Sequence, residues 1–168
     1  MTISQSLLGE LERESAGTRK TLERLPTGKF DFRPHPKSGT LGWLAGHIAN
    51  LPHRGTMVCT TESVDLAAPE YRQRPPEPVT AQQAVECFDQ QTAKFRAALE
   101  KMSGAQMMET WTLKMGDRTF MAVPRLAALR GLVFNHTVHH RAQLTVYLRM
   151  NDVPVPALYG PSADESGF

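Results

Sequence analysis

Three of the six histidines in this chain lie within five positions, in the stretch NHTVHHRAQL that spans residues 135–144. Residues four apart on a helix, such as His136 and His140, lie on the same side of it and one turn from each other. Their imidazole nitrogens are then close enough to share a metal ion at roughly 2.0–2.1 Å from each. His139 is offset in the other direction and is expected at the edge of that face. The stretch therefore predicts a pair of candidate metal ligands.

A third candidate ligand, His47, lies beside the apolar stripe of an earlier helical segment and joins the pair if the two segments pack together. Three neutral imidazoles leave coordination positions open for water or substrate, and they suit zinc, nickel or ferrous iron. Buried imidazoles can also be satisfied by hydrogen bonds. The spacing alone therefore leaves two alternatives open, a metal site and a hydrogen-bonded core pair. The other histidines are interpreted as surface or edge residues: His35, His53 and His139.

Four segments show the three- and four-residue apolar spacing of amphipathic helices. They begin near residues 3, 38, 80 and 124, and the first, third and fourth end near residues 25, 102 and 150. Ser38 and Thr80 are expected to cap the second and third helices. Pro52 is expected to kink or locally break the second, and Pro124 suits the first turn of the fourth. Such a pattern predicts an all-α fold, a four-helix bundle forming one domain over residues 1–168.

The fourth segment carries its apolar stripe through the histidine pair, so both imidazoles are expected to point into the core. The stripe consists of Leu126, Leu129, Val133, His136, His140, Leu144 and Tyr147. Before this segment, residues 109–123 alternate in polarity around Gly116 and Asp117, a dipeptide that suits a tight turn. A small β-hairpin is therefore expected between the third and fourth helices. Residues 62–80 are interpreted as a long connection, and residues 151–168 as an irregular tail.

Composition and charge exclude several classes of protein. The 19 basic and 17 acidic residues are nearly balanced and form no basic run, so nucleic acid is not expected as a partner. The N-terminus lacks the pattern of a secretory signal, and no apolar stretch has membrane-spanning length. A cytoplasmic protein without membrane contact is the expectation. Cys59 and Cys87 are far apart, have no CxxC partner, and are interpreted as ordinary thiols.

The notable polar and aromatic side chains outside the histidine set are interpreted as follows. Arg141 is interpreted as a surface salt-bridge residue, with binding of a substrate carboxylate as the alternative. Gln143 is either a ligand to an ordered water or a surface residue. The two tryptophans, Trp43 and Trp111, are interpreted as core or pocket-lining residues without a stacking role. Tyr159 is expected to pack over the end of the bundle, while the acidic residues of PSADE, residues 161–165, pair with Arg141 or Arg149.

Three stretches together resemble the DinB-like proteins, also called the DinB/YfiT-like metalloenzymes. They are GWLAGHIANLP in the second helix, NHTVHHRAQLTVYLR in the fourth, and VPVPALYGPSADE in the tail. The resemblance covers essentially the whole chain. It implies a four-helix bundle with up-down-down-up order, a homodimer, and a divalent metal ion bound by His47, His136 and His140. Met57 and Val58, read as apolar residues that the bundle leaves uncovered, also favour a dimer.

The resemblance implies less about activity than about fold, because most members have no assigned reaction. Related branches resemble mycothiol-dependent maleylpyruvate isomerase and bacillithiol S-transferases. A metalloenzyme is the first hypothesis, with a small-molecule substrate and a low-molecular-weight thiol that the metal activates for S-transfer. Metal-dependent hydrolysis is the second version. Non-catalytic alternatives are a metal-binding or damage-response module and a purely structural bundle. No carboxylate near the histidines offers itself as a general base, and the sequence assigns no catalytic residue.

Overall fold

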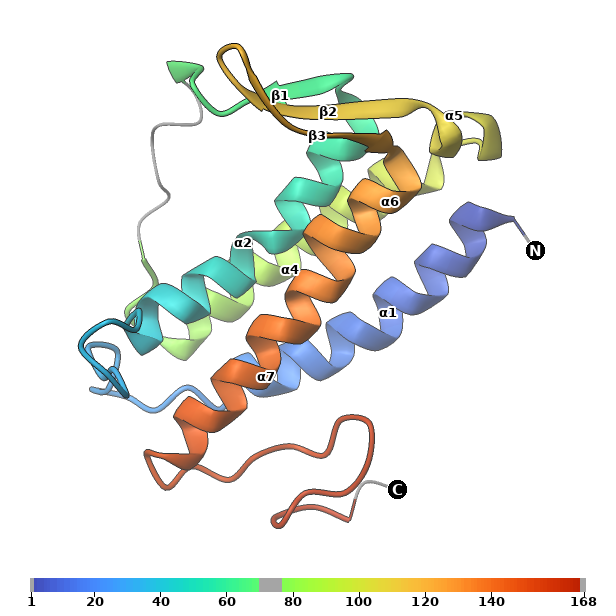
Figure 1. Cartoon of the computed structure of the whole chain (residues 1–168). Coiled ribbons are helices and arrows are strands. Elements are labelled where there is room, and N and C mark those ends of the chain that lie inside the picture. The colour runs from blue at the N-terminus through green and yellow to red at the C-terminus, as the bar shows by residue number, and fades with distance from the viewer. Residues whose placement is uncertain (1, 70–76, 167–168) are drawn as a thin grey trace.

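The computed structural model describes residues 2–69 and 77–166 and is mainly helical, with one small sheet (Figure 1). Its long helices are α1 (Ile3–Leu22), α2 (Leu41–Thr60) and α4 (Ala81–Glu100). A fourth helical segment is continuous through α6 (Arg125–Leu129), the π-helical turn η1 (Arg130–Phe134) and α7 (Asn135–Arg149). Helix α2 packs against both α4 and α7, and α1 packs against the same two helices. No helix within the described ranges is both long and apolar enough to cross a membrane.

The sheet lies at one end of the helices and has the strand order β1-β2-β3 (Figure 1). Strands β2 (Thr110–Met115) and β3 (Arg118–Pro124) form the antiparallel hairpin that the sequence predicts. Strand β1 (Ser63–Asp65) pairs in parallel with β2, although its residues read as part of a connection. A carboxylate oxygen of Asp65 accepts a hydrogen bond of 2.9 Å from the backbone N–H of Gly116 in the hairpin turn. Such long-range pairing leaves no local sequence pattern.

The helix boundaries confirm one predicted cap and correct another. Thr80 caps α4 as predicted, accepting a hydrogen bond from the backbone N–H of Gln83. Thr40, not Ser38, caps α2. The break expected at Pro52 is not observed, because α2 continues as one helix to Thr60. The residues after Pro52 pack tightly, so that a Cβ atom added at Gly55 would lie 2.5 Å from the Phe95 ring. This packing offsets the hydrogen bond that a proline cannot donate.

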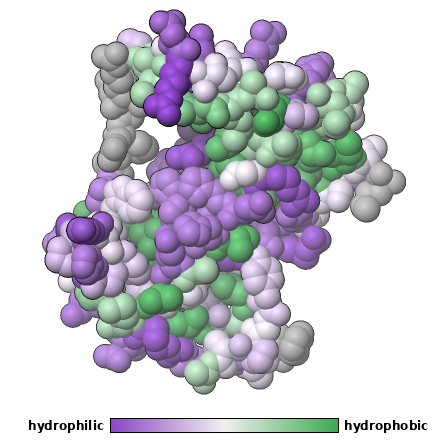
Figure 2. All heavy atoms as spheres, in the orientation of Figure 1, coloured by the Kyte–Doolittle hydropathy of each residue, from purple (hydrophilic) through white to green (hydrophobic). Residues whose placement is uncertain are grey.

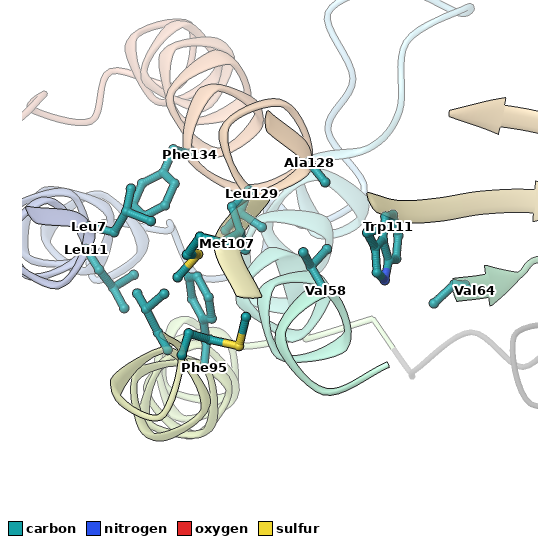
Figure 3. Packing of buried hydrophobic residues seen from close by; sticks show 13 residues of the cluster. Leu7, Leu11, Val58, Val64, Phe95, Met107, Trp111, Ala128, Leu129 and Phe134 are labelled. Atoms are coloured by element: carbon teal, nitrogen blue, oxygen red, sulfur yellow. The ribbon is translucent and has the colours of Figure 1, made fainter. Parts of the chain in front are cut away.

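The hydrophobic core consists of two clusters along the length of the helices. Figure 3 shows the cluster near the sheet, to which Leu11 from α1, Val58 from α2, Phe95 from α4 and Trp111 of β2 all belong. The second cluster fills the other end, around Ile48 of α2 and the C-terminal half of α7. Val58 is fully buried and Met57 packs against the first cluster. The expectation that both remain uncovered was therefore wrong.

The π-helical turn η1 changes which face of α7 enters the core. Its defining bond runs from the backbone N–H of Asn135 to the carbonyl of Arg130, five residues earlier. Each π turn holds one more residue than an α turn, so the buried face that follows shifts by about one position. The buried residues of α7 are Thr137, Arg141, Leu144 and Leu148. The prediction that His136 and His140 point fully into the core was thus wrong, and both are half-buried beside it.

Candidate metal centre

The structure brings His47, His136 and His140 together where α2 and α7 lie side by side. One ring nitrogen from each residue falls in a group whose members all lie within 4.8 Å of one another. The Nε2 atoms of His47 and His136 are 3.2 Å apart. Three nitrogens bound tetrahedrally to one ion at 2.0–2.1 Å lie roughly 3.3 Å from one another. The first pair already has this spacing, and His140 is within reach of the same point.

The two helices position the triad in different ways. His136 and His140 are one turn apart on α7, with ring centroids 4.7 Å from each other. His47 comes from the N-terminal half of α2, and its centroid lies 4.5 Å from that of His140 and 5.1 Å from that of His136. All three side chains are half-buried. In the orientation of Figure 1, Figure 2 shows a band of hydrophilic residues across the face that α2 and α7 form. The site therefore lies at the edge of the core with access to solvent.

Gln143 fixes the orientation of His140. Its side-chain Oε1 lies 2.7 Å from Nδ1 of His140, and because an amide oxygen only accepts, Nδ1 carries the proton. Nε2 of His140 therefore keeps its lone pair for a metal ion. Such a partner on the far side of a ligand sets both the tautomer and the ring direction. The sequence did not predict that Gln143 orients His140.

Two further residues lie beside the triad. Sequence reasoning missed Arg54, and it named Trp43 only as a core or pocket-lining residue. Nη1 of Arg54 lies 3.3 Å from Nδ1 of His136. The indole of Trp43 stacks on His47, with centroids 5.2 Å apart and planes at 10°, and is 36% exposed. The prediction of no stacking role for Trp43 was wrong. Trp43 lies four residues before His47 on the same helix, and Arg54 lies seven residues after it. This helical spacing is the signal that could have identified both contacts.

The electrostatic surroundings keep the triad uncharged. Burial is the main cause that lowers the pKa of His47 to about 4, and the charges of His140 and Arg54 lower it further. Burial and Arg54 likewise lower the pKa of His136 to about 4. The pKa of His140 is lowered mainly by burial. No carboxylate in the part of the chain that the structure describes contributes to these shifts. Metal binding requires neutral imidazoles, and all three are neutral at pH 7.

These shifts predict how the stability of the metal-free protein depends on pH. Between pH 6.5 and pH 4 the unfolded chain binds protons at His47 and His136 that the folded protein does not, so the free energy of unfolding falls as the pH falls. Solvent reaches the half-buried rings, so the expected loss is on the order of 1 kcal/mol per ring. Urea unfolding of the chelated protein at several pH values measures it. The free energy of unfolding of a His47→Gln variant should fall less over the same pH range. An equal fall in the variant and the wild type would contradict the prediction.

The other three histidines do not belong to the group of candidate ligands. His35, His53 and His139 are all exposed, as expected of surface or edge residues. The His139 ring touches that of His140 edge to face, with centroids 4.8 Å apart. The two cysteines are unpaired. Burial raises the pKa of Cys59 to about 11 and also raises that of Cys87, so neither is a thiolate at neutral pH. Trp111 is a core residue, as predicted.

Arg141 is not the surface residue that was predicted. It is 2% exposed and pairs with Glu14 of α1 at 2.7 Å. It also donates to the hydroxyl of Tyr159, which itself donates to Glu14 and so fastens the tail to α1. A guanidinium held in this way is not available to a substrate carboxylate. Arg149 pairs with Asp164 as expected, whereas Glu165 pairs with Arg24 rather than Arg141.

This chain is similar to known proteins in sequence and in fold. The model of the DinB superfamily matches residues 10–144. The uncharacterized protein YrdA of Bacillus subtilis (strain 168) is 26% identical over 154 residues, which cover 92% of this chain and 86% of YrdA. Solved structures of DinB-like proteins show the same fold. That of Bacillus cereus ATCC 10987 has a TM-score of 0.72 and 24% identity over 94% of this chain and 98% of its own. YjoA of Bacillus subtilis has a TM-score of 0.69 and 20% identity, covering 90% and 96%.

Proposed function

The chain belongs to the DinB superfamily, and from this membership and the triad we propose that it is a metal-dependent enzyme that acts on a small molecule. His47, His136 and His140 would hold one divalent ion. A low-molecular-weight thiol would be the second substrate. The observation that carries the proposal is the convergence of three ligand nitrogens from two helices within 4.8 Å.

The residues present fit a divalent metal ion. Their donor set is three neutral nitrogens, which suits zinc, nickel or ferrous iron. Gln143 holds His140 in the tautomer that leaves Nε2 unprotonated. Three protein ligands fill fewer positions than these ions accept, and solvent reaches the half-buried rings. This combination favours a catalytic site over a closed structural one.

The surroundings of the triad favour S-transfer over hydrolysis. When bound, the ion would act as a Lewis acid that lowers the pKa of a thiol or of water. No Asp or Glu within residues 2–69 and 77–166 contributes to the pKa of the three rings, so no carboxylate stands beside them as a general base. A thiol is far more acidic than water and depends less on such a base. Hydrolysis of a small molecule is therefore the second candidate.

The proposal extends to the architecture. The resemblance, together with the packing of α2 against α4 and α7, supports a four-helix bundle of up-down-down-up order as one domain over residues 1–168. A homodimer in the cytoplasm is part of the proposal and rests on the resemblance and the sequence. Sedimentation of the purified protein would separate a dimer from a monomer.

The test is metal content followed by a thiol titration. Protein purified without a nickel column is analysed for metal, and about one equivalent per chain is expected. The protein is then loaded with cobalt and titrated with 2-mercaptoethanol. A new near-ultraviolet charge-transfer band is expected, because the thiol would reach the open coordination side. Absence of metal, even after zinc, nickel or ferrous iron is added, would overturn the proposal. Bound metal without a thiol band would instead support hydrolysis or a non-catalytic metal-binding module.

A further inference from the structure

Arg54 is a half-buried cation that has no acidic partner among the residues that the structure describes. It lies on α2, two turns after His47, and its Nη1 is 3.3 Å from Nδ1 of His136. Within residues 2–69 and 77–166 that contact is its one side-chain hydrogen bond, and it forms no ion pair. The two buried arginines have more hydrogen-bond acceptors than Arg54. Arg141 pairs with a carboxylate, and Arg125 donates to two backbone carbonyls. A guanidinium withdrawn from water without an acceptor is costly.

Metal binding would remove the single partner that Arg54 has. The Nε2 atoms of His47 and His136 face each other, so an ion between the helices would take these nitrogens. A neutral imidazole that gives its Nε2 lone pair to a metal carries its proton on Nδ1. Nδ1 of His136 would then be a donor, and the backbone carbonyl of Leu132 is an acceptor for this ring. Nδ1 could no longer accept a hydrogen bond from Arg54, which itself has only donors. The guanidinium would need a different acceptor.

The charge balance of the site identifies the kind of acceptor. Three neutral imidazoles leave both charges of a divalent ion uncompensated, and Arg54 adds another positive charge beside it. The charged groups that influence the three rings are Arg54 and the histidines themselves, among the residues that the structure describes. In a half-buried site with this positive charge, an anion is favoured over a neutral ligand. The planar guanidinium binds carboxylate and phosphate oxygens with paired hydrogen bonds.

We propose that Arg54 determines substrate specificity by binding an oxyanion group, carboxylate or phosphate, of a small molecule held beside the metal ion. The inference rests on the proposed function, because it places the substrate next to the metal. Trp43, stacked on His47 and partly exposed, offers an aromatic surface for the carbon skeleton of the same molecule. The substrate class is therefore a small organic anion. Acetate and inorganic phosphate are the simplest probes of the two oxyanion groups.

The experiment compares anion binding by cobalt-loaded variants. The visible absorption of the bound cobalt reports the dissociation constants of acetate and of phosphate without any assay of activity. Arg54→Gln is expected to raise the dissociation constant of the preferred anion at least about tenfold, and Arg54→Lys less, because lysine keeps the charge without the paired donors. Arg118→Gln is the matched control. It removes the same charge from an exposed position on β3 and should change neither constant.

The outcomes separate this inference from the proposed function. A tenfold loss for acetate alone identifies a carboxylate, and a loss for phosphate alone identifies a phosphate. Equal dissociation constants for Arg54→Gln and wild type, at full cobalt occupancy in both, overturn the role of Arg54 while leaving the metal site intact. A wild-type protein that binds no cobalt overturns the metal site itself. If Arg54→Gln does not fold, the comparison of Arg54→Lys with wild type decides, and equal constants again overturn the role.

Discussion

Alanine in place of His136 or His140 is expected to reduce the metal content from about one equivalent per chain to a small fraction of it. Each substitution leaves two of the three nitrogens that converge between α2 and α7. Changing a residue that merely orients a ligand already lowers metal affinity about 10- to 100-fold. Loss of the ligand itself should therefore lower it by more than about 100-fold. Elemental analysis after dialysis against zinc measures the effect.

Two further substitutions on the same helix act as controls for the loss of a ligand. His139→Ala removes an exposed imidazole next to His140 and should retain the metal. Gln143→Leu removes the partner of His140 and should give an intermediate affinity, because the ligand remains but its tautomer is no longer fixed. Equal metal content in His139→Ala, His136→Ala and His140→Ala would show that the metal is bound elsewhere or not specifically.

Removing the carboxylate of Glu14 is expected to destabilise the folded protein strongly. Glu14→Ala leaves the guanidinium of Arg141, 2% exposed, without its counter-ion. Leaving one buried charge unpaired costs about 3–5 kcal/mol, and the partial exposure of Glu14 puts the effect near 3. For a domain of this size the melting temperature should fall by roughly 10 °C. Denaturant unfolding and calorimetry of the metal-free protein both measure it.

The matched controls distinguish an unpaired charge from a general effect of substitution. Glu12→Ala removes the same charge from an exposed position on α1 and should cost little. A double variant, Glu14→Ala with Arg141→Met, should be more stable than Glu14→Ala alone, because the unpaired charge is gone. A cost below about 1 kcal/mol for Glu14→Ala, or a double variant that is less stable than either single one, would contradict this account.

The same ion pair affects the arrangement around the metal site indirectly. Arg141 follows His140 directly in sequence, yet it points to α1 while His140 faces α2. The pair, together with the hydroxyl of Tyr159, ties α1, α7 and the tail to one another. Helix α7 therefore has one polar anchor on each of two faces. One anchor is structural, and the other is the candidate metal centre.

Features that depend on neighbouring residues could be predicted from the sequence. Helical periodicity, the cap at Thr80 and the hairpin around Gly116 are set by bonds and sterics within a few residues. The pairing of His136 with His140 on one side of a helix is local in the same sense, because it needs only the helix itself. His47 was a candidate on similar grounds, though its approach to the pair depended on how two helices pack.

Only the tertiary structure decided which faces of the helices meet. The π turn at Arg130–Phe134 rotated Thr137 and Arg141 into the core and left His136 half-buried. Such a turn has no reliable local signal, because its extra residue is tolerated only where the surrounding packing accepts it. Burial of Arg141 likewise required Glu14, which lies 127 residues away in the chain. Spacing along one helix is fixed by its own backbone, whereas contact between helices depends on the packing of all of them. The sequence therefore identified the three histidines as candidate ligands. The packing of α2 against α7 determined the distances between them and placed Arg54 beside them.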